Sequence, residues 1–389
     1  LIIFSSYLLS NISENKADNS NIFFQNRVSD LLIFLSLYFI YKFSNSISFD
    51  FVFKSFQTLE NKISFFGNKF RIFDFVTFIL FFSFLLRFRK FYISNSRYDI
   101  VNFDTASYSL ALYILYLPVG LYFILRFLTL TQISLEYLNF LLIFGSVLTF
   151  IFSILLVFSY NLKKLILYIV SAQFGVILIL VGLQLYNAVI FHFFTSLISL
   201  VIISLAFGII SSKLNYEQDI RKMGYLVVKC PSLFVFILIG FVSLLGIPYF
   251  SGFYSNKLIF LQLLLINKES YYLILTYCFL YTFILSYTSF KIMLVVFLGN
   301  NNCNIHLYNK LEDDSYYLKS MLFLLSIFII FSGWYLNNLF SSNFSEHIWR
   351  LTLVGDIGLP INHNLDNNKW PFEARYFICY FGIFMAFLN

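Results

Sequence analysis

One histidine, His192, lies in the apolar run AVIFHFFTSLISLVIISLAFG at residues 188–208, which is long enough to form a membrane helix. An ionisable side chain in hydrocarbon is costly, so it is by default a candidate for a functional site. An imidazole titrates near neutral pH and could shuttle protons there. The alternative is a neutral histidine that is hydrogen-bonded to Thr195, Ser196 or a facing carbonyl.

The composition predicts the environment of this histidine. Of the 389 residues, 60% are hydrophobic and only 12% are charged, whereas soluble globular domains carry about 25% charged residues. The net charge of +7 does not indicate a nucleic-acid partner, because the basic residues stand in short loops between apolar runs. We therefore expect an all-α polytopic membrane protein. The 54 Phe and 28 Tyr are residues that AT-rich codons favour, which points to an organelle genome.

The apolar runs predict about ten transmembrane helices, two of them interrupted. The spans lie at residues 22–43, 70–88, 105–127, 137–160, 165–185, 188–212, 231–262, 270–299, 317–340 and 373–389. Residues 44–69 are too polar to cross and are expected at the membrane interface. Residues 341–372 form the longest polar loop.

Two segments interrupt the apolar pattern. Around residues 87–104 an apolar helix gives way to RFRKFYISNSRYDIVNFD, and around residues 240–256 a hydrophobic segment contains Gly246, Pro248 and Gly252. Broken helices at membrane depth are tolerated where they line protein or a watery cavity, and in transporters they mark the ion path. A Gly-Pro kink in a packed helix is the alternative.

The basic residues predict an orientation. Lys163 and Lys164 stand in one loop, and Lys213, Arg221 and Lys222 stand in another loop two spans later. Both loops therefore lie on the same side of the membrane, and the positive-inside rule places them on the matrix or cytoplasmic face.

The cysteines and the start of the chain predict no chemistry. Cys230, Cys278, Cys303 and Cys379 show neither a CxxC pair nor metal-ligand spacing, so we expect no metal site. The first residues, LIIFSSYLLS, lack a methionine and the charged region of a signal peptide. Either the chain is processed, or it is a piece whose earlier helices lie elsewhere.

Residues 161–259 carry a family resemblance. They contain NLKKLILYIVSAQFG, then IFH, then LNYEQDIRKMGYL, then GFVSLLGIPYFSGFYSNKLI. This pattern resembles the subunit 5 family of NADH:ubiquinone oxidoreductase, respiratory complex I, which is related to cation/proton antiporter subunits. The EQDIRKMG octet argues against a free-standing antiporter, and weaker matches extend the resemblance over nearly the whole chain.

The resemblance implies a role for each matched position in a mid-membrane proton relay. Asp30 matches an aspartate that tunes a lysine, although pairing to Arg27 near a helix start is the alternative. Arg87 takes the place of a relay lysine, and an arginine cannot release its proton. On the following helix, Leu112 takes the place of a titratable histidine of the relay.

The resemblance also implies a degraded relay around His192. A His-His-Lys face on one helix reads His192, Ser196 and Leu200 here, so only the first member remains. A Ser-Lys-Asp motif at the broken helix reads Ser255, Asn256 and Lys257, which moves the lysine by one position, or about 100° around a helix. Lys257 is a candidate for a titrating amine, or else it snorkels from the end of a half-helix.

The motif loop is expected to be structural. Glu217, Gln218, Asp219, Arg221 and Lys222 combine both signs of charge and more plausibly fix loop packing by salt bridges than move protons. Lys291 is sufficiently explained as an interface anchor.

The family implies the setting of the chain. We expect a single membrane domain over 1–389, with a partial first antiporter-like half at 1–127, a second half at 128–299, and C-terminal spans with a polar loop at 300–389. No cofactor is expected here, because NADH, FMN, Fe–S clusters and ubiquinone are bound by other subunits of that complex. Expected partners are other membrane-arm subunits, above all a neighbouring antiporter-like subunit, together with phospholipids such as cardiolipin and a separate polypeptide that supplies missing helices. The expected location is the mitochondrial inner membrane, with a bacterial plasma membrane as the alternative.

Two functions stay open from the sequence. The chain is a proton-translocating subunit with His192, Lys257, Arg87 and Asp30 on the path, or it is a structural subunit of the same complex that has lost conduction. The replacements at Ser196, Leu200 and Asn256 favour the second for this chain's own contribution.

Overall fold

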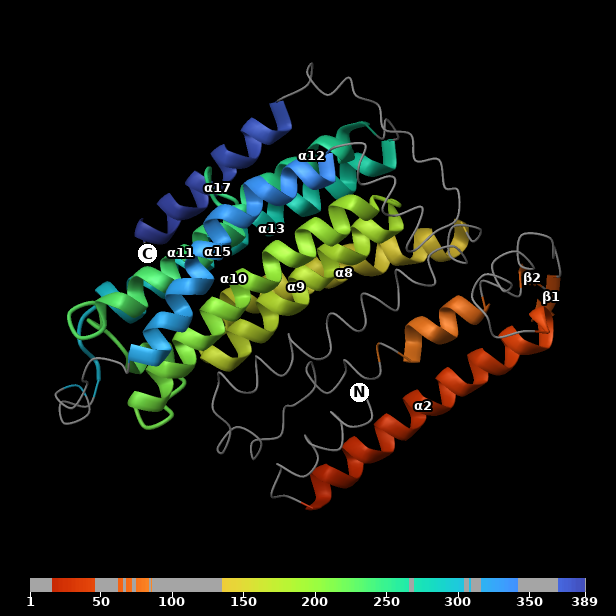
Figure 1. Ribbon diagram of the computed structural model, residues 1–389, viewed down its shortest axis with the longest axis horizontal. Helices are drawn as coiled ribbons and strands as arrows, with labels where there is room; N and C mark the ends of the chain where they lie inside the picture. Colours follow the sequence, from red (N-terminus) through yellow and green to blue (C-terminus); the bar gives the residue numbers. More distant parts are fainter. Residues whose placement is uncertain are drawn as a thin grey trace. The chain divides into compact units, whose positions relative to one another are not determined.

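The computed structural model shows a helical membrane protein (Figure 1). It describes residues 16–45, 62–65, 68–71, 75–83, 85, 135–265, 269–303, 308, 316–341 and 370–388. The long helices are α2 (Lys16–Ser44), α8 (Leu135–Phe158), α9 (Leu162–Gly182), α10 (Tyr186–Lys213), α11 (Pro231–Leu245), α12 (Ser251–Leu265), α13 (Glu269–Met293), α15 (Tyr316–Ser341) and α17 (Trp370–Leu388). Five described helices are long and apolar enough to cross a membrane. The predicted all-α polytopic class is confirmed, whereas the predicted span at 105–127 and the interruption around 87–104 lie outside the described residues.

The chain divides into two compact units. The first contains residues 1–102, 111–141 and 352–355, and the second contains 103–110, 142–351 and 356–389. Within the first unit, Phe81 packs edge-to-face against Tyr137 and Phe140, with ring centroids 6.2 and 5.9 Å apart. These contacts join the helical segment 75–83 to the start of α8.

The first unit also holds a β-hairpin that we did not predict. β1 (Lys62–Phe65) pairs with β2 (Asn68–Arg71) in antiparallel register, with Ile63 opposite Phe70. Polar and apolar residues alternate along KISF, which is the period of a strand and not of a helix. The span that we predicted from residue 70 is therefore wrong at its start, because the described helix there begins at residue 75.

Helix α10 forms the core of the second unit. It packs against α9, α11, α12 and α15, and α13 packs against α17. Helices α9 and α10 are apolar on nearly all sides, so they can be buried around their whole circumference. At the contact of α8 and α9, Gly145 and Gly175 let the two backbones approach, since a Cβ on Gly145 would lie 2.8 Å from the Gly175 carbonyl oxygen.

The predicted span 231–262 is broken into α11 and α12 at residues 246–250, inside the range that we predicted. Gly246 has φ 70°, and its N–H bonds the Ser243 carbonyl at 3.1 Å while Ile247 N–H bonds Val242 at 3.2 Å. This left-handed C-cap favours glycine, and Pro248 follows where the helix can no longer continue. Gly252 lies in the first turn of α12, where a Cβ would collide with the Ser243 carbonyl. The interruption is therefore a tight junction in which both half-helices touch.

Candidate functional site

His192 is buried on α10, where its side chain is directed at α9. It is 5% exposed, and its Nε2 lies 2.9 Å from Oε1 of Gln173. Of the three partners that the sequence left open, Thr195, Ser196 or a facing carbonyl, the first two do not bond the imidazole. Their hydroxyls donate to carbonyls of their own helix, at Phe191 and Phe193 respectively, because a helical Ser or Thr reaches the preceding turn. The facing carbonyl is the side-chain amide of Gln173.

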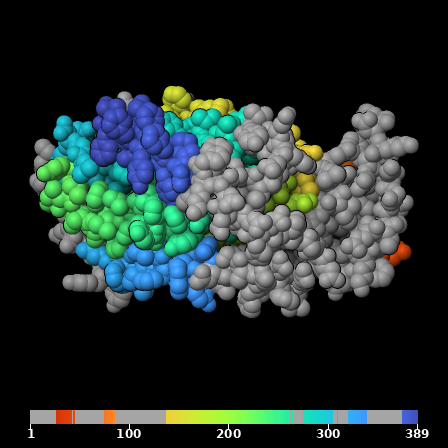
Figure 2. All heavy atoms as spheres, turned by 90° about the horizontal axis from the view of Figure 1, so that it is seen from above, coloured from red at the N-terminus to blue at the C-terminus, as the bar shows by residue number. Residues whose placement is uncertain are grey.

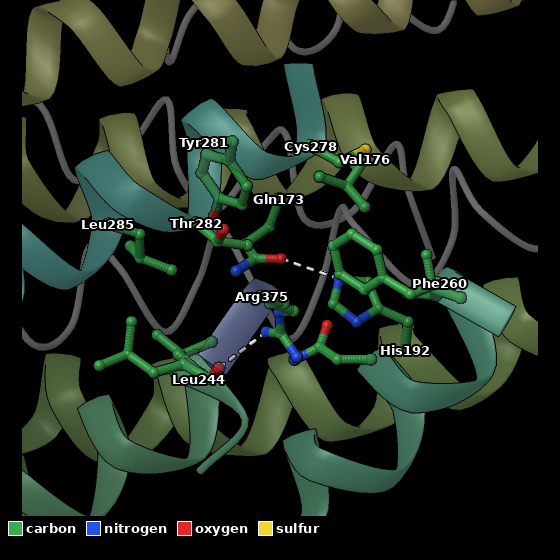
Figure 3. A pocket seen from close by; sticks show the side chains of 13 residues that line it. Gln173, Val176, His192, Leu244, Phe260, Cys278, Tyr281, Thr282, Leu285 and Arg375 are labelled. Atoms are coloured by element: carbon green, nitrogen blue, oxygen red, sulfur yellow. Dashed lines mark hydrogen bonds between the residues drawn. The ribbon is translucent and has the colours of Figure 1, made fainter. Parts of the chain in front are cut away.

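A small cavity adjoins this histidine (Figure 3). Side chains from α9, α10, α11, α12, α13 and α17 line it, and the centre of a water molecule can occupy about 20 Å³ of it. One water needs about 10–15 Å³ on that measure. The cavity lies where the broken helix meets its neighbours, since Leu244 and Leu245 end α11 and Asn256 belongs to α12.

The cavity contains a buried arginine that our sequence analysis missed. Arg375 on α17 is 2% exposed, and its Nη2 donates to the Leu245 carbonyl at 2.7 Å. That carbonyl is one of those left unsatisfied at the end of α11, where the helix dipole favours a cation. The guanidinium also lies 5.2 Å from the ring centroid of Phe260. The one available signal was an arginine in EARYFICYFG, inside a predicted span.

Arg375 lies on the face of α17 that packs against the core. Phe377, Tyr380 and Phe384 are exposed at 77%, 56% and 57%, while Arg375 and Cys379 are buried on the other side. Figure 2 shows α17 in dark blue at the surface of the described second unit. Residues four apart share a helix face, so Arg375 and Cys379 point together toward the core.

The other predicted path residues are not in this cavity. Lys257 is exposed, while the preceding residue Asn256 is 7% exposed and lines the cavity. The one-position displacement has therefore turned the lysine away from His192. Asp30 belongs to the first unit and pairs with Arg27 at 3.3 Å. Arg87 and Leu112 lie outside the described residues.

Two further positions of the expected relay face are buried on α10. Ser196 is 5% exposed and Leu200 is fully buried. Thr195 contributes a polar contact between helices at this level, because its hydroxyl lies within hydrogen-bond distance of Ser255 Oγ on α12, at 3.1 Å. This bond connects α10 to the half-helix that carries Asn256.

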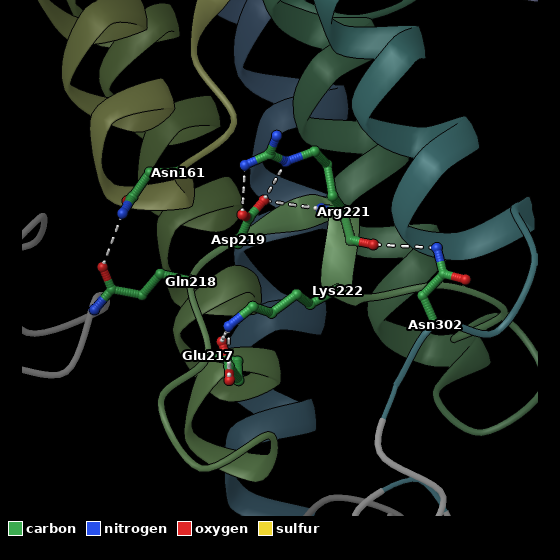
Figure 4. A network of polar contacts seen from close by, with 7 residues as sticks. All are labelled: Asn161, Glu217, Gln218, Asp219, Arg221, Lys222 and Asn302. Atoms are coloured by element: carbon green, nitrogen blue, oxygen red, sulfur yellow. Dashed lines mark hydrogen bonds and ion pairs between the residues drawn. The ribbon is translucent and has the colours of Figure 1, made fainter.

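The motif loop forms a separate polar network (Figure 4). Arg221 Nη2 bonds Asp219 Oδ2 at 2.8 Å, and Lys222 Nζ lies 3.2 Å from Glu217 Oε2. The hydrogen bonds from Arg221 hold the pKa of the Asp219 carboxyl below its usual value. The salt bridges that we predicted for this loop are present.

The same loop ties together three segments at one end of the second unit. Leu162 N–H donates to the Gln218 carbonyl at 2.9 Å, and Asn302 Nδ2 donates to the Arg221 carbonyl at 3.1 Å. The start of α9 and the loop after α10 therefore meet, as their predicted placement on one side of the membrane requires. Tyr160 lies between two cations there, at 4.6 Å from Arg221 and 4.8 Å from Lys291.

Comparison with known proteins identifies relatives of this architecture. Residues 1–284 match the family model described as NADH:quinone oxidoreductase/Mrp antiporter, TM. The chain is 28% identical over 329 residues to NADH-ubiquinone oxidoreductase chain 5 of Chondrus crispus, which covers 82% of this chain and 49% of that protein. It is 27% identical over 346 residues to the protein of that name from Acanthamoeba castellanii, covering 86% and 51%. The chain thus spans about half the length of these curated relatives.

Two solved structures share the fold. A chain of the membrane-bound sulfane sulfur reductase, an archaeal respiratory membrane complex, has a TM-score of 0.66 at 18% identity, covering 85% of this chain and 54% of that one. A chain of the Mrp complex from a Dietzia species has a TM-score of 0.63 at 15% identity, covering 83% and 66%. Both are similar to this chain in fold.

Proposed function

The chain belongs to the NADH:quinone oxidoreductase/Mrp antiporter membrane family, and from that premise we propose that it works as an antiporter-like subunit in the membrane arm of respiratory complex I. In this proposal it contributes to proton translocation that is driven by NADH oxidation and ubiquinone reduction. The electron carriers NADH, FMN, Fe–S clusters and ubiquinone belong to other subunits. The partners are other membrane-arm subunits, and the location is the mitochondrial inner membrane.

One observation carries the proposal for this chain's own residues. His192 lines a water-sized cavity at the junction of two half-helices, and Gln173, Asn256 and Arg375 add polar groups to its largely apolar wall. Buried polar groups at a broken helix are the arrangement that ion paths use in transporters. Arg375 cannot release its proton at any working pH, so within the described lining His192 is the side chain of the type that proton shuttles use.

The competing function is a structural subunit of the same complex. Asn256, Ser196 and Leu200 stand where the family carries lysine or histidine, which favours this alternative. Under it, the Gln173–His192 pair would only hold α9 to α10.

The substitution His192→Gln separates the two functions. Glutamine can still hydrogen-bond Gln173 but cannot titrate. In vesicles that contain the assembled complex, the pumping function predicts fewer protons moved per NADH oxidised, measured with a pH-sensitive dye beside NADH absorbance. An unchanged ratio in a fully assembled variant would contradict pumping through His192.

The matched control is Gln173→Leu, which removes the hydrogen-bond partner of His192 and keeps the imidazole. If the pair is only structural, Gln173→Leu lowers the amount of assembled complex, His192→Gln lowers it less because the hydrogen bond can still form, and neither variant changes the proton ratio. Native gel electrophoresis measures that amount.

A further inference from the structure

The charge of Arg375 is not balanced by the described residues around it. The side chain is 2% exposed, and a guanidinium stays protonated at every working pH. Its recorded contacts are the Leu245 carbonyl and the Phe260 ring, neither of which carries a full negative charge. No Asp or Glu is among the described residues that line the cavity. A buried cation without a counter-charge is strongly destabilising.

The hydrogen-bonding capacity of the guanidinium is also incompletely used. Nε and Nη1 of Arg375 have no hydrogen-bond partner among the described residues. Nδ1 of His192 likewise has no hydrogen-bond partner among the described residues. When the Gln173 amide is turned by about 180°, its nitrogen donates to His192 Nε2. The ring proton is then on Nδ1, which can donate to a ligand in the cavity.

The cavity beside these donors has room for one small ion or one water molecule. The cavity admits a water centre over about 20 Å³, which excludes a carboxylate metabolite, and apolar side chains such as Leu244, Leu285 and Ile259 form much of its wall. Figure 3 shows Arg375, Gln173 and His192 converging on it from α17, α9 and α10. A water would complete hydrogen bonds but would leave the positive charge unbalanced.

We propose that this cavity binds one small monovalent anion of halide size, held by the Nε and Nη1 groups of Arg375 with His192 beside it. The anion completes the hydrogen bonds of the guanidinium and neutralises its charge. This binding site is independent of the proposed function, because it is present whether or not the chain conducts protons.

Bromide is the probe for this site, because it scatters anomalously. The complex that contains the chain is purified and crystallised in sodium bromide, and in parallel in sodium gluconate at the same ionic strength. We expect an anomalous peak within hydrogen-bond distance of the Arg375 guanidinium in bromide and none in gluconate, whose anion is too large for the cavity. A cavity that holds only water, or a carboxylate of another segment or subunit on Arg375, would overturn the proposal.

Variants test whether Arg375 holds the ion. Arg375→Gln should lose the bromide peak, and Arg375→Lys should weaken it, since lysine carries a positive charge but lacks the two N–H groups that hold the ion. The matched control is Lys222→Gln, which removes an exposed cation in the motif loop and should keep the peak. A peak that persists in Arg375→Gln marks an adventitious ion only and refutes the site.

Heat resistance gives a second readout that needs no crystals. Halide that binds the folded state alone stabilises it by mass action. The wild-type complex should therefore lose activity at a higher temperature in chloride or bromide than in gluconate, and the Lys222→Gln complex should behave likewise. If Arg375→Gln does not assemble, the wild-type and Arg375→Lys comparisons still decide, because an absent halide effect in both contradicts the proposal.

Discussion

Replacing Gly246 by alanine should open the junction of α11 and α12 and expose the cavity. The residue has φ 70°, a conformation that costs an L-residue about 1–2 kcal/mol. A Cβ there would lie 2.8 Å from the Gly252 carbonyl oxygen, 2.5 Å from Asn256 Nδ2 and 3.0 Å from Arg375 Nη1. Overpacking of this kind costs about 1–3 kcal/mol, so the sum is about 2–5 kcal/mol.

The buried cysteine Cys278 reports this opening. It lines the cavity and is 6% exposed, so a maleimide reaches it when the junction opens. At 1.36 kcal/mol per tenfold change, Gly246→Ala should speed its labelling by about 30-fold to about 5,000-fold. The assay is pulse labelling in native membranes followed by mass spectrometry, and the partly exposed Cys303 serves as the internal reference.

A matched glycine makes the test specific. Gly299 has φ −67°, and a Cβ there would come no closer than 3.0 Å to the Val295 carbonyl oxygen. Gly299→Ala should therefore change Cys278 labelling much less than Gly246→Ala does. Equal labelling of Cys278 in wild type and in a stably folded Gly246→Ala variant would refute the reasoning from strain and contact.

Three further predictions concern the motif loop and the contact of α10 with α12. Gly224 has φ 150° and its Cβ would collide with the Asn300 carbonyl, so Gly224→Ala should cost about 2–5 kcal/mol and accelerate trypsin cleavage at Arg221; unchanged cleavage would contradict this. Because the pKa of Asp219 is lowered in the folded loop, the ionised carboxylate stabilises the loop at neutral pH, and this stabilisation is lost as the pH falls through the lowered pKa. Acidification should therefore lower the protection factor of the Arg221 N–H, the factor by which its exchange is slower than that of an unstructured amide at the same pH, because this N–H bonds Asp219 at 3.1 Å. Asp219→Asn should abolish the pH dependence of this protection factor; an equal dependence in the variant would count against it. Thr195→Val removes the hydroxyl that bonds Ser255 and should destabilise by about 0.6 kcal/mol in heat denaturation, whereas Ser204→Ala, which removes a bond within α10, should cost less; equal losses would argue against the interhelical bond.

The broken helix shows how well local signals could be used. Gly246 and Pro248 end a helix through their own backbone preferences, which act within a few residues, so the break was predictable from its own segment. The hairpin at residues 62–71 shows the limit of the same approach. Its alternation is short, and we took the segment for interface and the start of a span.

The partners of His192 could not be predicted in the same way. Thr195 and Ser196 are its neighbours in sequence, but their hydroxyls are occupied by the preceding turn of α10. Gln173 lies 19 residues earlier, and Arg375 reaches the cavity from a helix far along the chain. Nothing in the sequence specifies which face of α17 meets α13.

The sequence by itself determined that the chain is a helical membrane protein, which family it resembles and where one helix must break. These properties depend on apolar run lengths, a short motif and glycine conformation, all of which are local. Only the tertiary structure decided that Lys257 points away from the cavity and that Arg375 supplies its buried charge. The physical reason is that the rotation of each helix about its axis is set by packing against its neighbours, and one residue of displacement turns a side chain by about 100°.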